Sequence, residues 1–447
     1  MKFRTRSAAI ALLATLGLGG VALAQLGNPP STIVLPVLAL IGATDLIQDI
    51  PNGAPVVGNQ YVTALQLAGY GGTLPTRGNA LIGGDATQNL WQRGTTGPST
   101  TTTYLYEADR FFAWSGTSTA MTVAKDTTAA DLPATGYSAA FKMARTASQT
   151  GLVQMCHAQI VATVNSYQFQ GTTAEFDFHA TAGANFSAAS SDLVAYIVTG
   201  TGSDDGAQKL AWGLNTGGGG STAWAGQANA TAAVIPISTT SGRYAAVATI
   251  PAGATEIAAV ICYTPVGTAG ANDYVAIAGE QLVRNPSLAG SVSATAGYSC
   301  SANSGGAPAN GVGIACTTFD RTRNASAEAA LQYPYYYQIT EGAAGTVRGV
   351  CRSRSTTVCS WDIKFPVAMR AAPTMSYTAG FSTETTVAGG TLGACTGFAA
   401  DTTVSSAVSS VSEAFAACTA GTVPAAGTVD QMYDDGGSGA VKASAEL

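Results

Sequence analysis

Three polar residues alternate along one short segment of the chain. Glu175, Asp177 and His179 occupy every second position, with phenylalanines between them. Because side chains point alternately to the two faces of a strand, the segment is predicted to be a strand with two acids and a histidine on one face. Such a set could act in catalysis or bind a metal. It is also typical of a half-exposed strand, which is the interpretation we favour.

A second acidic pair, Asp204 and Asp205, lies in a Gly-rich segment and could donate oxygens to calcium. Calcium takes about six to eight oxygen ligands, and adjacent carboxylates seldom converge on one ion. We therefore expect a plain turn. With 2 histidines and no paired C-x-x-C spacing, a zinc site is not expected either, and no cofactor is predicted.

The usual constellations of an enzyme are missing from the sequence. No G-x-S-x-G elbow occurs, and the 26 acidic residues are scattered. A pair of catalytic acids on separate strands, as in glycoside hydrolysis, remains an alternative, because the separation of two acids depends on the tertiary structure. We expect a protein without catalytic activity.

The chain contains 8 cysteines. In an exported chain they are expected to form four disulfides, because export leads to an oxidising compartment. Spacing suggests three pairs and elimination leaves the fourth, namely Cys351–Cys359, Cys395–Cys418, Cys300–Cys316 and Cys156–Cys262. Free buried thiols remain the alternative for Cys156 and Cys262.

Residues 1–24 have the three parts of a secretory signal peptide: a basic start, an apolar run and a small-residue site before Gln25. Their removal would change the net charge from −6 to −9, because they hold three basic residues and no acid. No later segment reaches the roughly 20 apolar residues of a membrane span. We therefore expect no membrane contact after signal removal and, without a basic patch, no nucleic-acid partner.

Only 10% of the 447 residues are charged, and 53 are glycine. This composition is more common in shell and fibre proteins than in cytosolic enzymes. Short alternating segments such as 191–198 and 244–250 are separated by clusters of Gly, Thr, Ser and Asn. The pattern predicts an all-β fold with a β-sandwich.

Several short sequence motifs within residues 83–282 are similar to motifs of a known protein module. They are Asn89–Gly94, Tyr106–Trp114, Ile250–Glu256, Tyr263–Gly270 and the closing Gln281-Leu282. In their order and separation they resemble a jelly-roll module of tail-fibre and other structural proteins of tailed bacteriophages. The resemblance implies that the sandwich is jelly-roll-like.

One short helix is predicted over residues 325–332. Glu328 lies in its first turn, where the helix dipole favours an acid, and Pro334 stops it. Together with the phrase FPVAMRAAPT at 365–374, this segment resembles the C-terminal domain of many phage tail fibres. Residues 333–335 depart from that family, which usually has Cys, Gln and Arg there.

The chain is therefore predicted to contain a jelly-roll-like β-sandwich followed by a second, smaller β-sandwich domain with one short helix. The expected boundaries are a signal peptide at 1–24, an attachment segment and linker at 25–82, the first sandwich at 83–286, a linker at 287–316 and the second domain at 317–447.

The resemblance implies a structural protein of the virion tail that recognises host-surface glycans without catalysis. It further implies a homotrimer whose partners are other tail or virion proteins and cell-surface polysaccharide. Our glycan-binding candidates are Trp91, Trp114, Trp212 and Trp224 for stacking, with Asp109 and Arg110 for hydroxyl groups. Burial in the core is the competing interpretation of the large aromatic residues near the first strands, and we favour it.

The signal peptide conflicts with assembly in the cytoplasm, where virion subunits are normally made. A secreted or cell-surface bacterial adhesin built from phage-like domains is therefore the alternative. A polysaccharide hydrolase is the third hypothesis.

Overall fold

The computed structural model describes most of the chain from Gly78 onward. The described residues are 78–95, 104–115, 121–133, 136–215, 222–284, 297–300, 316–319, 325–340, 347–353, 355, 357–378, 381–384, 392–400, 413–420, 429–434 and 439–446, several of the last strands by backbone alone. The predicted signal peptide and the attachment segment through residue 77 lie outside these ranges. The chain divides after Gly78, and the described residues from Asn79 onward belong to the second of its two compact units.

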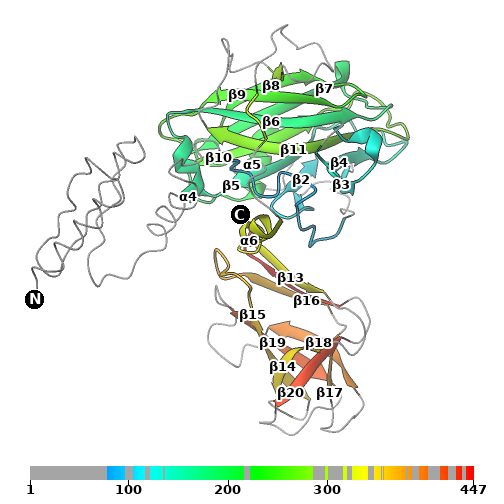
Figure 1. The fold of residues 1–447 in the computed structure, drawn as a ribbon, viewed down its shortest axis with the longest axis vertical. Helices are drawn as coiled ribbons and strands as arrows, with labels where there is room; N and C mark the ends of the chain where they lie inside the picture. Colours follow the sequence, from blue (N-terminus) through cyan, green and yellow to red (C-terminus); the bar gives the residue numbers. More distant parts are fainter. Residues whose placement is uncertain are drawn as a thin grey trace, which may run out of the picture. The chain divides into compact units, whose positions relative to one another are not determined.

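Two six-stranded antiparallel sheets make up the larger part of the described structure (Figure 1). Their orders are β1-β2-β5-β10-β7-β8 and β12-β9-β6-β11-β4-β3. The strands are β1 (Leu105–Tyr106), β2 (Phe112–Ser115), β3 (Met121–Asp126), β4 (Ala140–Arg145), β5 (Met155–Val161), β6 (Thr173–Ala182), β7 (Asp192–Gly200), β8 (Ala228–Pro236), β9 (Gly242–Thr249), β10 (Glu256–Tyr263), β11 (Tyr274–Arg284) and β12 (Gly297–Ser299).

The two sheets enclose one hydrophobic core. Phe176 and Phe178 of the second sheet belong to the same buried cluster as Ile257 and Ile261 of the first. The strand alternation predicted for residues 174–179 is therefore observed, with the phenylalanines turned inward. The predicted all-β fold with a β-sandwich is confirmed.

Short helices connect the strands, and α5 (Ala207–Asn215) was not predicted. Its residues Ala207, Leu210 and Ala211 join Trp114 and Phe112 in a second buried cluster on the outer face of the first sheet. This cover explains why every residue of β5 and β10 is buried, instead of every second one. The other connecting helices are η1 (Ala129–Asp131), α4 (Thr163–Ser166), η2 (Tyr167–Phe169) and η3 (Ala189–Ser191).

The predicted linker 287–316 contributes to the sandwich. Its β12 pairs with β9, and the Cys300 backbone N–H donates to the Arg243 carbonyl at 3.0 Å. Three of the four predicted disulfides are present, namely Cys156–Cys262, Cys300–Cys316 and Cys351–Cys359. The free-thiol alternative for Cys156 and Cys262 is thus wrong. The side chains of Cys395 and Cys418 lie outside the described residues, so that pair stays a prediction.

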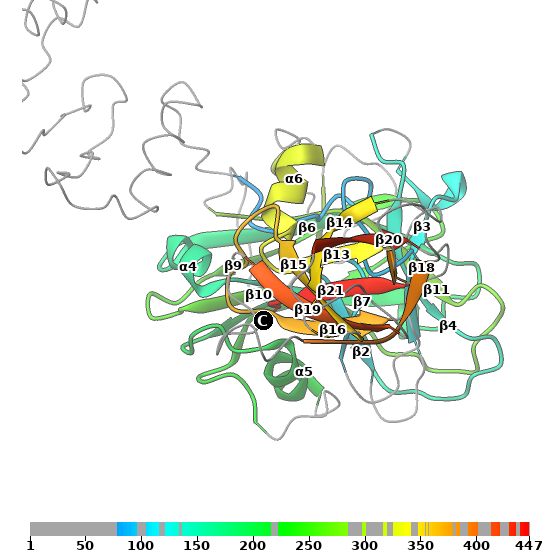
Figure 2. The same ribbon diagram turned by 90° about the horizontal axis from the view of Figure 1, so that it is seen from below.

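The C-terminal part begins with α6 (Ala325–Gln332), at the predicted bounds (Figure 2). A three-stranded sheet has the order β13-β21-β16, and six further strands close into a barrel in the order β14-β15-β19-β18-β17-β20. The predicted smaller domain is therefore β-rich but contains a barrel, and closure leaves these strands without free edges. The strands are β13 (Tyr336–Thr340), β14 (Val347–Ser353), β15 (Val358–Lys364), β16 (Thr374–Thr378), β17 (Phe381–Glu384), β18 (Leu392–Ala400), β19 (Glu413–Ala420), β20 (Val429–Asp434) and β21 (Ala440–Ser444).

No helix in the described ranges has the length and apolar character needed to cross a membrane.

Candidate functional site

Three of the four tryptophans predicted to stack on sugars are buried. Trp91, Trp114 and Trp224 are 5%, 0% and 2% exposed. The Trp91 indole N–H donates to the Ala86 carbonyl at 2.9 Å, as expected of a tryptophan in a core. Trp212 of α5 is partly exposed. Only Trp212 of these four therefore offers a ring to a ligand in the folded protein.

Asp109 and Arg110, predicted to bind sugar hydroxyls, are also buried. The Arg110 guanidinium lies 2.6 Å from the Glu446 carboxylate and 3.6 Å from the centre of the Tyr335 ring. Burial raises the pKa of Asp109 to about 6, although hydrogen bonds from Gln92 oppose this shift. Both residues therefore contribute to contacts inside the protein and do not face a ligand.

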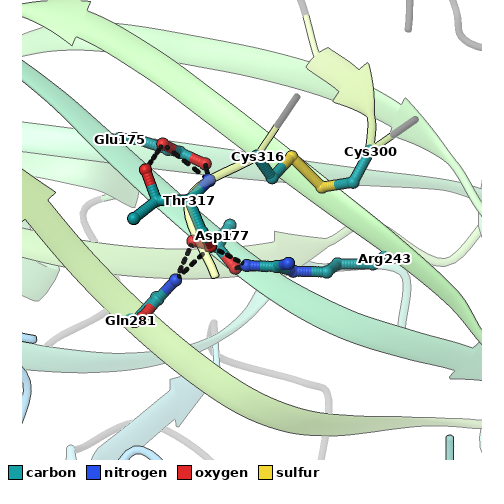
Figure 3. Close-up of a disulfide and its surroundings, with 7 residues drawn as sticks. All are labelled: Glu175, Asp177, Arg243, Gln281, Cys300, Cys316 and Thr317. Atoms are coloured by element: carbon teal, nitrogen blue, oxygen red, sulfur yellow. Dashed lines mark hydrogen bonds and ion pairs between the residues drawn. A yellow bond between two sulfur atoms is a disulfide. The ribbon is translucent and has the colours of Figure 1, made fainter. Parts of the chain in front are cut away.

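The alternating acids of β6 are covered. Glu175 and Asp177 are both 0% exposed, whereas His179 is partly exposed. Thr317 donates to Glu175 through its backbone N–H at 3.0 Å and through Oγ1 at 2.7 Å (Figure 3). The half-exposed interpretation is wrong for both acids, because the segment around Thr317, tied by Cys300–Cys316, lies over this face.

Asp177 has its own set of partners beneath the same segment. The Arg243 Nε–H donates to its carboxylate at 2.9 Å and the Gln281 amide at 2.7 Å (Figure 3). Burial raises the pKa of Asp177 to about 8 against the opposing charge of Arg243, and Glu175 raises it further. The acids thus form a buried polar layer and have no open face for a substrate.

Asp204 and Asp205 turn to different partners. Asp204 accepts from Arg370 at 2.6 Å and from the Thr163 backbone N–H at 3.0 Å, while Asp205 pairs with Lys209. Within the described ranges, no group of three or more His, Cys, Asp or Glu side chains could hold a metal ion.

One candidate ligand surface among the described residues borders α5 on the outer face of the first sheet. Five apolar side chains stay partly exposed there, and all but Trp212 pack against the buried cluster under α5. We call them the aromatic rim: Tyr104, Tyr106, Tyr196, Trp212 and Leu214. Beside it, Val234 is 46% exposed and is paired with Val194 across β7 and β8.

Strand register aligns two members of the aromatic rim. Paired positions run across the sheet in one row, which is Tyr106, Phe112, Ala158, Val260 and Tyr196. Four strand steps separate the ends, or roughly 19 Å at about 4.8 Å per step. The three middle side chains, Phe112, Ala158 and Val260, are buried in the cluster under α5, so only the two ends of the row face outward. A ligand touching both ends must therefore be extended and must cross this covered middle.

The rim combines apolar faces with polar groups. The rings of Tyr104 and Tyr106 are 6.2 Å apart and nearly perpendicular. At the other end the Gln154 amide donates to the Tyr196 hydroxyl at 3.3 Å. Aromatic faces beside a few hydrogen-bonding groups are typical of small-molecule sites. Tyr196 could have been found by sequence, because it alternates with the inward-facing Ala195 and Ile197.

No family model and no curated protein matches the chain. Solved structures that are similar to it include three with low TM-scores. The enzymatically active domain of bacteriophage CBA120 tailspike protein 4 has 15% identity and a TM-score of 0.27, over 46% of this chain and 21% of that one. A CBM4 structure has 12% identity and a TM-score of 0.21, over 32% and 70% of the two chains.

The third is the tandem CBM22-1–CBM22-2 domain of Xyn10C from Paenibacillus barcinonensis. It has 9% identity and a TM-score of 0.24, over 78% of this chain and 96% of that one. These similarities to a phage tailspike domain and to carbohydrate-binding modules are too low to support an argument about the site.

Proposed function

We propose that this chain is a non-catalytic structural protein of a tailed-phage virion that binds host-surface glycans through the aromatic rim. The observation that carries the proposal is the row from Tyr106 to Tyr196, which ends in partly exposed tyrosine rings on one sheet face. The sequence motifs within residues 83–282, which resemble those of phage structural proteins in their order and separation, support the virion role.

Sugar rings suit this surface because their C–H faces are apolar and their edges carry hydroxyl groups. Tyrosine rings would stack on the faces, and the Tyr196 hydroxyl and Gln154 amide would meet the edges. A separation of roughly 19 Å between the ends favours an extended polysaccharide over a single sugar. Each site would be shallow and weak, so we also propose a homotrimer that gains avidity.

Binding without catalysis is part of the proposal. Glu175 and Asp177, two carboxylates on one strand face, are fully buried beneath Thr317 and are held by neighbouring donors. Release of reducing sugar from a broad panel of envelope polysaccharides would overturn this part and favour the hydrolase.

The proposal is tested by measuring binding of the purified full chain to bacterial envelope polysaccharides. Loss of one stacking ring is worth about 0.5–1.5 kcal/mol, so Tyr196→Ala is expected to weaken binding roughly two- to twelvefold. Tyr167→Ala is the matched control, because Tyr167 is 52% exposed on η2, outside the aromatic rim. Equal affinity of Tyr196→Ala and the wild type would contradict the rim as the site.

A secreted bacterial adhesin is the second candidate, and the three disulfides favour it because they form in oxidising compartments. Mass spectrometry of phage particles and of secreted fractions from the source culture separates the two. Recovery in particles supports the virion role, whereas recovery only in capsid-free secreted material, beginning at Gln25, supports the adhesin.

A further inference from the structure

Lys142 lies between two carboxylates on the outer face of the second sheet. Its Nζ is 3.0 Å from Asp126 Oδ2 and 3.2 Å from Asp131 Oδ2. Asp126 ends β3, Asp131 ends η1, and Lys142 belongs to β4. Asp126 is paired with Ala140 and Lys142 with Ala124, so Asp126 and Lys142 are diagonal neighbours within reach of a long side chain.

The group is more covered than an ordinary surface ion pair. The exposed fraction of the side chain is 5% for Asp126, 7% for Asp131 and 25% for Lys142. The Tyr274 ring centre lies 3.7 Å from Lys142 Nζ, and the Tyr274 hydroxyl donates to Asp131 Oδ1 at 2.8 Å. Burial would raise the pKa of Asp126, but its hydrogen bonds, those from Thr128 first, lower it, so the protonated Asp126 carboxyl is a minor species.

The two oxygens of Asp126 have different surroundings. The Thr128 backbone N–H donates to Oδ1 at 2.9 Å, whereas Oδ2 faces the Lys142 amine. An amine, a carboxyl carbon, a donor to one carboxyl oxygen and a second acid are therefore gathered at one point. These are the parts of an acyl-transfer site that acts on the protein itself.

We propose that Lys142 and Asp126 condense into an intramolecular isopeptide bond, with Asp131 as the proton carrier. This modification is independent of the proposed glycan binding.

The reaction needs no partner beyond these groups. The neutral Nζ attacks Cγ of the protonated Asp126 carboxyl, and the Thr128 N–H stabilises the charge that develops on Oδ1. Asp131 takes the proton that Nζ loses and delivers it to the departing oxygen. One C–N bond forms, one C–O bond breaks, and one water leaves.

Ion pairing disfavours the neutral form of the Lys142 amine, which is the form that attacks. Burial alone would lower the pKa of Lys142, but Asp126 and Asp131 raise it, so the neutral amine is a minor species. The bond has to form only once per chain, and fixed geometry supplies a high effective concentration. The product replaces the charges of Lys142 and Asp126 by a neutral amide, while Asp131 keeps the hydrogen bond from the Tyr274 hydroxyl.

The bond would fasten an edge of the sandwich. β3 is the last strand of its sheet and pairs only with β4 there. Edge strands are the first to separate from a sheet when few interactions hold them. A covalent link from Asp126 to Lys142 would keep β3 in place when an exported fibre-like chain is pulled.

The test is peptide mapping of the purified full chain by tandem mass spectrometry after complete reduction of the disulfides. We expect a branched peptide that joins the segments of Asp126 and Lys142, lighter than the sum of its parts by one water. Separate, unmodified peptides would overturn the proposal. Loss of one water without a branched peptide indicates a succinimide at Asp126, and it would overturn the proposal equally.

Three variants assign the roles. Asp131→Asn keeps the amine and the acceptor but removes the proton carrier, so the branched peptide should be lost. Lys142→Arg should abolish it, whereas the control Lys125→Arg on the neighbouring position of β3 should retain it. A branched peptide in Asp131→Asn would overturn the role of Asp131, and its loss in Lys125→Arg would overturn the choice of Lys142.

Discussion

The Arg110 guanidinium and the Glu446 carboxylate form an ion pair of 2.6 Å between side chains that are 2% and 5% exposed. The two residues are 336 positions apart, and the pair joins the sandwich to the end of the C-terminal part. Arg93 lies 3.2 Å from the same carboxylate, so Glu446 serves two cations. A buried pair of this kind is costly to break because the remaining charge keeps no counterion.

Glu446→Ala is therefore expected to lower the free energy of unfolding by about 3–5 kcal/mol. The exposed pair of Lys364 and Asp362 supplies the control, and Asp362→Ala should cost at most about 1 kcal/mol. Denaturant unfolding of the full chain measures both. Similar losses in the two variants would contradict a special role of the Arg110 pair.

The disulfides are expected to differ in their contribution to stability. Cys156–Cys262 closes a sequence separation of 106 residues and Cys300–Cys316 one of 16. A disulfide stabilises the folded state because it restricts the unfolded chain. This effect predicts a stabilisation of about 4.7 kcal/mol for a loop of about 100 residues and of about 3 kcal/mol for a loop of about 15 residues. Thermal unfolding of the two double Cys→Ala variants tests the order, which would be refuted by a larger loss for the shorter loop.

Glu107 is expected to make the sandwich less stable as the pH rises. It is 2% exposed, and burial raises the pKa of Glu107 from 4.5 to about 9. The folded state therefore holds the proton more tightly than the unfolded chain. This stabilisation is complete below about pH 4.5 and is lost as the pH rises through about 9.

Removal of this carboxyl should flatten the pH profile. Glu107→Gln cannot titrate, so its free energy of unfolding should decline less than that of the wild type between about pH 5 and pH 9. Asp177, with a pKa raised to about 8, contributes in the same direction in both proteins. Asp362→Asn is the exposed control and should keep the wild-type slope. Parallel curves for Glu107→Gln and the wild type would argue against this assignment.

The cover over the acids of β6 should depend on one hydroxyl. Thr317→Val removes the hydrogen bond of 2.7 Å to Glu175, and hydrogen bonds to charged groups contribute about 1.5–3 kcal/mol. Denaturant unfolding should show a loss of this size. The exposed Thr264 is a matched control, and Thr264→Val should change stability by less than about 0.5 kcal/mol. A Thr317→Val variant as stable as its control would contradict the inferred cover.

Local features were predicted well from sequence because neighbours along the chain decide them. The alternation around Phe176 and Phe178 identified a strand and its inward face, and Pro334 marked the end of α6. Cysteine spacing identified the pairs within short loops, since a short loop brings its ends together in most arrangements. Helix α5 was missed although Ala207, Leu210 and Ala211 follow helical spacing, because the segment is only nine residues long and lies beside a Gly-rich segment.

The sequence by itself determined the all-β class, the inward faces of the strands and the disulfides of short loops. Only the tertiary structure decided which outward faces stay open. Glu175 and Asp177 were covered by Thr317, and Trp114 by α5, whereas register carried Tyr106 and Tyr196 into one row. Alternation is a property of each strand alone, but cover and register depend on packing between segments far apart in the chain.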